Sequence, residues 1–76
     1  SRAAVLRLYH LLDRISDERR AVWVLRFVEG LDPAELSAVL GCSLATTKRR
    51  VADAAKRVTF LAASDPLLAP YLQEAP

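Results

Sequence analysis

The sequence predicts an all-α domain, and three observations point to it. The chain has 76 residues, a length that allows one compact domain. It contains 13 alanines and 13 leucines but only eight valines and isoleucines together and two glycines, a composition that favours helices over sheets. Apolar residues also recur at helical spacing between capping and breaking residues. We therefore expect a compact four-helix domain containing a helix-turn-helix, with a short C-terminal helical extension.

The first helix is expected over residues 3–15, which contain neither glycine nor proline. Its apolar residues recur on one face, comprising Val5, Leu8, Leu12 and Ile15. Ser16 interrupts this pattern and is suited to cap a second helix over residues 17–29. The charged residues that open the second helix are expected to form a mutually compensating, solvated cluster of Asp17, Glu18, Arg19 and Arg20.

The second helix is expected to bury one apolar face, made by Val22, Leu25 and Val28 and widened by Trp23 and Phe27. If these aromatic rings lay on the surface instead, they would mark a contact with a partner protein. Gly30 is expected to end the helix in the left-handed conformation.

The third helix has the clearest start signal in the chain. Asp32 is suited to cap it, Pro33 fits its first position, and Glu35 can close a capping box. Gly41 is expected to end this short helix, and Ser43 to cap a fourth one that continues to about residue 63. The fourth helix has an apolar stripe comprising Leu44, Thr47, Val51, Ala54 or Ala55, Val58 and Leu61.

Residues 1–63 are expected to form the domain, and residues 64–76 a C-terminal extension that packs on the domain or on a partner. Pro66 and Pro70 leave room in the extension for one or two helical turns. These turns would carry the apolar residues Leu67, Leu68, Tyr71 and Leu72.

The sequence argues against several functional classes. The single cysteine, Cys42, rules out an internal disulfide framework, and with the lone His10 it cannot form a tetrahedral metal site. We therefore expect neither a metal nor a cofactor. No membrane span or secretory signal is visible, which predicts a cytoplasmic protein without a membrane partner. No acid pair, nucleophile–base set or phosphate loop is present, which argues against an enzyme.

The net charge of +2 hides an uneven distribution of charged residues. Residues 1–42 contain six arginines and six acids, which cancel. Residues 43–58 hold five basic residues against Asp53 alone, a net charge of +4, whereas residues 59–76 carry two acids. Positive charge confined to one segment suggests a polyanion, such as nucleic acid, as the partner.

A short helix, a tight turn at Gly41 and a longer basic helix form the pattern of a helix-turn-helix. Cations on the second helix can reach phosphates and guanine edges in the major groove, and its capped N-terminus can hold a phosphate. The candidate DNA-binding residues are Ser43, Ala45, Thr46, Lys48, Arg49, Arg50, Ala52, Asp53 and Lys56. Arg50 has an alternative role, an ion pair with Glu29 or Glu35. The same pattern also fits an ordinary four-helix bundle with a solvated charged face.

Two motifs carry a resemblance to a known family. Residues 25–31 read LRFVEGL, and residues 44–51 read LATTKRRV after the short helix and its glycine. With the rest of the stretch from Arg20 to Val58, they resemble region 4, the C-terminal domain of bacterial RNA polymerase sigma factors. The extracytoplasmic-function type is the most similar. The likeness covers about residues 3–60 without gaps.

The resemblance implies a role in transcription initiation. Region 4 docks on the flap of the polymerase β subunit and reads the minus-thirty-five element of promoter DNA in the major groove. By position, Lys48 and Arg49 would face bases or phosphates. Thr46 and Arg50 would face the backbone, and the next groove positions would fall to Ala52 and Asp53. An anti-sigma factor is a further partner that the family implies.

Two positions depart from the family pattern. Family members commonly have arginine where this chain has Asp53, and a larger side chain where it has Ala52. A carboxylate in the groove repels phosphate unless it accepts a hydrogen bond from a cytosine amino group. Three alternatives stay open: an unusual DNA sequence, weak DNA binding, or a sigma-like module that binds polymerase or an anti-sigma factor. A dimeric response-regulator type of helix-turn-helix is a further alternative.

Overall fold

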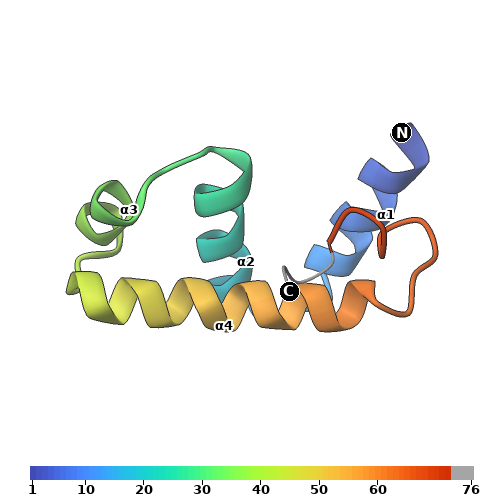
Figure 1. Ribbon diagram of the computed structural model, residues 1–76. Helices are drawn as coiled ribbons and strands as arrows, with labels where there is room; N and C mark the ends of the chain where they lie inside the picture. The colour runs from blue at the N-terminus through green and yellow to red at the C-terminus, as the bar shows by residue number, and fades with distance from the viewer. Residues whose placement is uncertain (73–76) are drawn as a thin grey trace.

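The computed structural model describes residues 1–72, and most of this part is helical. Its elements are α1 (Arg2–Leu12), α2 (Asp17–Trp23), the π-helical segment η1 (Val24–Val28), α3 (Pro33–Leu40) and α4 (Leu44–Ala62). Figure 1 shows α4 running along one side of the molecule, with α3, α2 and α1 placed successively along it. The prediction of an all-α fold is confirmed, and α3 and α4 form the helix-turn-helix.

Local capping signals set most of the helix ends as the sequence predicts, but α1 ends at Leu12 and not at residue 15. Ser16 and Ser43 cap α2 and α4, each accepting a hydrogen bond from the backbone N–H three residues later. Asp32 and Glu35 form the predicted capping box at the start of α3. Gly30 and Gly41 have φ angles of 76° and 67°, the left-handed region that favours glycine. These glycines allow the chain to reverse direction before and after α3.

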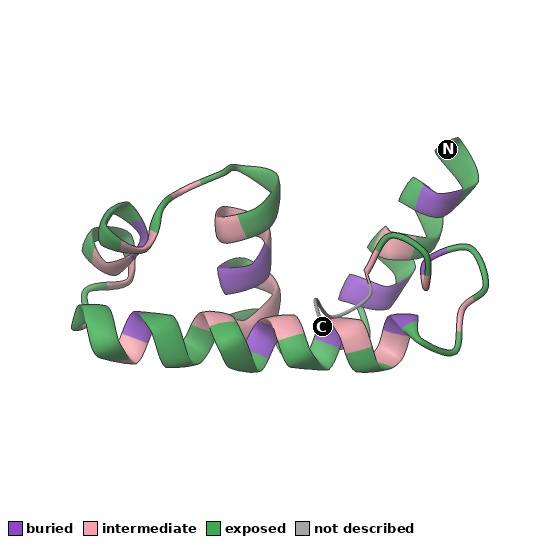
Figure 2. Ribbon diagram, in the orientation of Figure 1, coloured by how far each residue is buried: buried purple, intermediate pink, exposed green. Residues whose placement is uncertain are grey.

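The core lies between α4 and the other three helices. The residues that α4 buries follow helical spacing, so that one face of the helix points inward (Figure 2). Leu36 of α3 and Val22 of α2 pack with this face, and α1 closes the other end of the core with Leu11 and Leu12. The full set of buried apolar residues is Ala4, Leu11, Leu12, Ile15, Val22, Trp23, Leu36, Ala54, Val58, Ala62 and Leu68.

The apolar face predicted for the second helix is only partly buried. Trp23 is buried, but Phe27 and Val28 are 48% and 57% exposed. By α-helical spacing Phe27, five residues after Val22, lies about 140° around the helix from it. Both exposed residues belong to η1, in which the N–H of Glu29 donates to the carbonyl of Val24, five residues earlier, at 2.9 Å. The predictions of core positions for Phe27 and Val28 are therefore wrong.

Two other apolar residues are more exposed than predicted. Val5 is exposed because the first turns of α1 extend away from α4 (Figure 1). Leu44 is exposed because it is the first residue of α4 and precedes Thr47, the first residue that this helix buries. Both positions lie at helix ends, where a periodic pattern continues but no neighbouring helix covers it.

Residues 65–72 form consecutive hydrogen-bonded turns rather than a regular helix. Leu68 is buried in the core, and Leu72 packs against it. The Asp65 carboxylate accepts a hydrogen bond from Arg7 Nε at 2.9 Å, which ties the turns to α1. Residues 73–76 of the predicted extension lie outside the described residues. In the part that is described, no helix has the length and apolar character needed to cross a membrane.

Candidate nucleic-acid interface

The candidate residues lie on α4 between its start and Lys56, and at its N-cap, Ser43. All nine are at least partly exposed, and only Thr46 is half-buried. Because α4 turns Thr47, Ala54 and Val58 inward, the side of the helix opposite the core is made of Ala45, Arg49, Ala52, Asp53, Lys56 and Phe60. We call this set the outer stripe. It places five of the predicted residues on one surface that faces away from the other helices (Figure 2).

A chain of hydrogen bonds orders the start of α4. Ser43 Oγ accepts from the backbone N–H of Thr46 at 3.1 Å, and the two hydroxyl oxygens lie 3.0 Å apart. Arg49 Nη2 donates to Thr46 Oγ1 at 3.1 Å. The guanidinium of Arg49 is therefore held toward the helix N-terminus, where backbone N–H groups and the helix dipole already favour an anion.

The turn between α3 and α4 is fixed from the inside by Thr47. Its side chain is fully buried, and its hydroxyl donates to the carbonyl of Ser43 at 2.9 Å. Cys42 Sγ lies 3.2 Å from the hydroxyl oxygen of Thr47. The polar atom of Thr47 is thus satisfied despite its burial, and it joins the turn to the helix that follows.

Arg50 forms an ion pair within the domain, as its alternative role predicted, but its partner is neither Glu29 nor Glu35. Arg50 Nε lies 3.6 Å from a carboxylate oxygen of Glu18 on α2, not beside Glu29 or Glu35. The reason is that α2, rather than α3, flanks this side of α4. Both side chains are largely exposed, so an approaching phosphate can compete for Arg50.

Arg19 and Asp53 form a second ion pair between α2 and α4, which sequence reasoning missed. Arg19 Nε donates to Asp53 Oδ2 at 2.7 Å, and Nη2 donates to Oδ1 at 3.4 Å. The hydrogen bond from Arg19 is the main cause that holds the pKa of Asp53 below its ordinary value of 3.8. The same bond raises the pKa of Arg19. Asp53 is therefore an ionised carboxylate at neutral pH.

The predicted compensating cluster at the start of α2 is therefore divided. Arg20 pairs with Asp17 and Asp13, close to it in the sequence. Glu18 and Arg19 instead reach across to α4. A pattern of alternating charges cannot distinguish these arrangements, because the partners on α4 lie more than 30 residues away and meet α2 only after folding.

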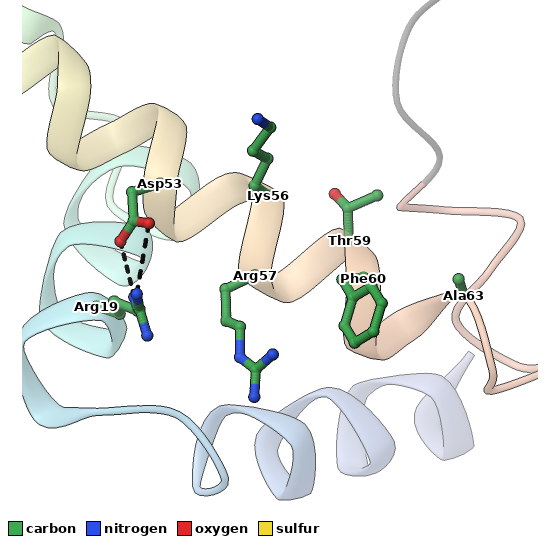
Figure 3. A pocket seen from close by; sticks show the side chains of 7 residues that line it. All are labelled: Arg19, Asp53, Lys56, Arg57, Thr59, Phe60 and Ala63. Atoms are coloured by element: carbon green, nitrogen blue, oxygen red, sulfur yellow. Dashed lines mark hydrogen bonds and ion pairs between the residues drawn. The ribbon is translucent and has the colours of Figure 1, made fainter.

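Cations surround Asp53 on the surface of α4. Lys48, Arg49, Lys56 and Arg57 form no ion pair with any carboxylate of residues 1–72. Figure 3 shows the Arg19–Asp53 pair at one end of a hollow of about 450 Å³, which Lys56, Arg57 and Phe60 also line. Its walls come mainly from α4. Across the described residues, no group of three potential metal ligands is present.

The geometry suits a polyanion more than a small molecule. The hollow is open, and the charged side chains follow an exposed helix instead of converging on an enclosed cavity. An exposed helix of this kind can enter the major groove of DNA, with its cations near phosphates and base edges. The helix-turn-helix holds it at a fixed angle to the remaining helices.

Comparison with known proteins agrees with this geometry. The family model described as sigma-70, region 4 matches residues 5–58, which include α2, α3 and most of α1 and α4. No curated protein and no solved structure shows significant similarity to the chain. Domains of the matched family generally bind the minus-thirty-five element of promoter DNA and interact with RNA polymerase, and the family is not one of enzymes. The chain belongs to the sigma-70 region 4 family.

Proposed function

We propose that this chain is the promoter-reading and polymerase-docking domain of a sigma factor of the extracytoplasmic-function type, acting in the cytoplasm. Helix α4 enters the major groove of the minus-thirty-five element. Lys48 and Arg49 contact bases or phosphates, Ser43, Thr46 and Arg50 contact the backbone, and Lys56 contacts a phosphate further along. Ala45 and Ala52 allow close approach to the bases, and Asp53, next to Ala52, also faces the groove.

The observation that carries this proposal is the placement of the unpaired cations. Arg49 and Lys56 are exposed opposite the buried face of the second helix of a helix-turn-helix, and the exposed Lys48 flanks them. The opposite face of α4 packs against α1, α2 and α3, so the face that carries these cations is the one that is free to meet a ligand. All six residues of the outer stripe are exposed, although Arg19 of α2 contacts one of them, Asp53 (Figure 2).

A titration with promoter-like duplexes at several salt concentrations tests the DNA half of the proposal. Affinity is expected to fall steeply as salt rises, because phosphate contacts release counterions. Lys48→Ala and Arg49→Ala should each weaken binding about tenfold and reduce the slope of log affinity against log salt by about one.

Arg2→Ala is the matched control for these variants. It removes the same charge from an exposed position in α1, at the other end of the molecule (Figure 1). Its effect on affinity should stay within about twofold, since it makes no phosphate contact. Equal losses for Arg2→Ala and Arg49→Ala, or no binding to any duplex at low salt, would contradict the proposal.

The polymerase half of the proposal is supported by the exposed apolar residues of η1. Phe27 and Val28 are exposed side by side in the sequence, and the Phe27 ring contacts Trp23 at a centroid distance of 5.4 Å and lies under Arg26. Exposed apolar side chains of this size mark protein contacts. We propose that this surface docks on the β flap. Phe27→Ser should reduce capture of the chain by immobilised β flap, while Lys48→Ala should not.

The second candidate function is a sigma-like interaction module that binds polymerase or an anti-sigma factor and has little affinity for DNA. Two observations favour it: the carboxylate of Asp53 amid the cations, and the exposed Tyr71 in the C-terminal turns. Truncation before Ser64 would remove Leu68 from the core, so Tyr71→Ser is the cleaner variant. Partner binding that depends on Tyr71 but not on Lys48 or Arg49, together with no salt-dependent DNA binding, would support this alternative.

A further inference from the structure

Asp53 stands where a DNA-binding helix would be expected to avoid negative charge. It lies on the outer stripe, one turn from Arg49 and one turn from Lys56. Its side chain is 56% exposed, so the carboxylate is accessible from outside the molecule. The Asp53 carboxylate is therefore open to a ligand. The groups that contact it indicate what its negative charge does at this position.

The structure provides one partner for this carboxylate from another helix. Arg19 of α2 contacts both carboxylate oxygens, at 2.7 and 3.4 Å, in the forked geometry that fixes a carboxylate most firmly. This contact limits the rotation of the Asp53 side chain. It leaves lone pairs on both oxygens, because each oxygen can accept more than one hydrogen bond. Asp53 is thus held in place and still able to accept a donor.

The base that suits a fixed carboxylate in the major groove is cytosine. An ionised carboxylate only accepts hydrogen bonds, and cytosine presents its N4 amino donor in the groove. Thymine presents the O4 acceptor and guanine presents N7 and O6, all of which repel a carboxylate. Adenine has an amino donor beside the N7 acceptor, so it is the weaker alternative.

Arg19 also reduces the electrostatic cost of placing Asp53 near DNA. A carboxylate among phosphates is repelled over a distance of about 10 Å at ordinary salt concentration. The guanidinium at 2.7 Å offsets most of this repulsion, since the pair as a whole is neutral. Loss of Arg19 would leave an unpaired negative charge facing the duplex.

We propose that Asp53 selects cytosine at one position of the DNA site and that Arg19 is the positioning residue that holds it for this contact. The inference rests on the proposed DNA-binding function and specifies part of the sequence that the domain reads. Arg19, on α2, thereby influences base selection without touching a base.

The test begins with selection from a random double-stranded DNA library, using the 76-residue chain at low salt. Affinities are then measured for the selected duplex and for copies with C·G replaced by T·A at each position. The unsubstituted chain is expected to prefer cytosine over thymine about tenfold at one position. Asp53→Ala should reduce this ratio to within twofold. Asp53→Asn should shift the preference at that position toward adenine, which asparagine pairs through N6 and N7.

Arg19→Gln tests the positioning role. It should lower the cytosine-to-thymine ratio to about threefold or less, whereas Arg19→Lys, which can still reach one oxygen, should retain more of the preference. In the Asp53→Ala background, Arg19→Gln should leave the ratio unchanged. Arg7→Gln is the matched control, because it breaks an ion pair of the same type with Asp65, beside the last turn of α4 and not beside the candidate DNA-binding residues, and it should preserve the ratio. Circular dichroism checks that each variant is folded.

The outcomes separate the two proposals. DNA binding without a cytosine preference that depends on Asp53 would overturn the selection of cytosine and leave the DNA-binding function standing. A preference that Arg19→Gln leaves intact would overturn the positioning role. If no duplex binds with salt-dependent affinity, the proposed function itself fails, and this inference fails with it.

Discussion

Two arginine–aspartate pairs join distant parts of this chain, one on each side of the molecule. Arg19 and Asp53 connect α2 to the outer stripe of α4, and Arg7 and Asp65 connect α1 to the turns after α4. The Asp53 side chain is 56% exposed, whereas that of Asp65 is 19% exposed and also accepts a hydrogen bond from the backbone N–H of Leu67. The same pair of residue types therefore anchors a turn in one place and leaves a carboxylate accessible in the other.

This contrast extends to the regions around the pairs. The helix-turn-helix end, comprising α3 and residues 43–53, has strong caps and an exposed charged surface. The α1 end, comprising α1, the last turn of α4 and residues 65–72, is joined mainly through buried apolar residues. The difference indicates that the N-terminal part of α4 exposes its charged side chains to a ligand. The C-terminal part is fixed in place by buried apolar contacts with α1 and residues 65–72. Four predictions test this division.

The largest effect is expected from removing apolar contacts in the core. Leu36→Ala should lower the free energy of unfolding by about 3 kcal/mol, because Leu36 is fully buried between α3 and α4. Leu68→Ala should cost less, about 2 kcal/mol, since the turns that carry Leu68 can rearrange to fill part of the cavity. Urea denaturation followed by the fluorescence of Trp23 measures both. A larger loss for Leu68→Ala than for Leu36→Ala would show that the core at the α1 end contributes more to stability than the core between α3 and α4.

Gly41→Ala should lower the free energy of unfolding by about 1–2 kcal/mol through backbone strain alone. Gly41 has φ of 67°, and an added Cβ would meet no atom within 4 Å. Gly30→Ala, with φ of 76° and equally open space, is the control with a similar loss. Only Gly41→Ala is expected also to weaken DNA binding, because Gly41 sets the angle between α3 and α4. Equal DNA affinities for Gly41→Ala and Gly30→Ala would show that the turn at Gly41 has no special role in DNA binding.

Ser43→Ala is expected to cost about 1 kcal/mol of stability, since it removes the side-chain cap of α4. Ser1→Ala removes the matching cap of α1 but should cost less, because the first turns of α1 are exposed except for Ala4 and have few contacts to lose. Thermal unfolding compares the two. A loss for Ser1→Ala as large as that for Ser43→Ala would mean that the first turn of α1 is as firmly ordered as the start of α4.

The smallest effect is expected from acid titration of the two pairs. Hydrogen bonds from Arg19 and Arg7 hold the pKa values of Asp53 and Asp65 below the ordinary 3.8. A lowered pKa in the folded state stabilises the protein above the unfolded value, and that contribution is lost as pH falls below about 3.8. Asp53→Asn and Asp65→Asn should each flatten the decline of the urea midpoint in this range.

Salt distinguishes the two titrations. Added salt should remove most of the Asp53 contribution, because this pair is the more exposed. It should remove less of the Asp65 contribution, because backbone hydrogen bonds from Leu67 and Leu68 also lower that pKa. The opposite order would contradict the assignment of Asp65 as the structural pair.

Local signals explain why much of this fold could be predicted from the sequence. The capping box of Asp32 and Glu35 and the left-handed Gly41 each depend on residues within a few positions of one another. The outer stripe followed from the helical spacing of Thr47, Ala54 and Val58, which fixed the opposite face. The DNA-binding roles of the residues on that face stay a prediction.

The features that sequence reasoning missed depend on contacts between distant segments. Arg19 and Asp53 are 34 residues apart, and no periodic pattern identifies them as partners. Phe27 was predicted in the core because the apolar face of the second helix was widened to include it, although α-helical spacing places it about 140° from Val22. One signal could have pointed to a partner such as Arg19. Asp53 is the only acid in a basic segment, and its carboxylate favours pairing with a cation from another part of the chain.

The uninterrupted course of α4 has a mechanical consequence. Its 19 residues span about 28 Å as a single rod, with a rise of about 1.5 Å per residue. The end that meets α1 lies far from the end at which the outer stripe begins (Figure 1). A tilt of about 5° at one end displaces the other by about 2 Å, more than half the length of a hydrogen bond. If α4 reads DNA as proposed, a protein that binds α1 and shifts it against α4 would therefore change which base edges Arg49 and Asp53 can reach.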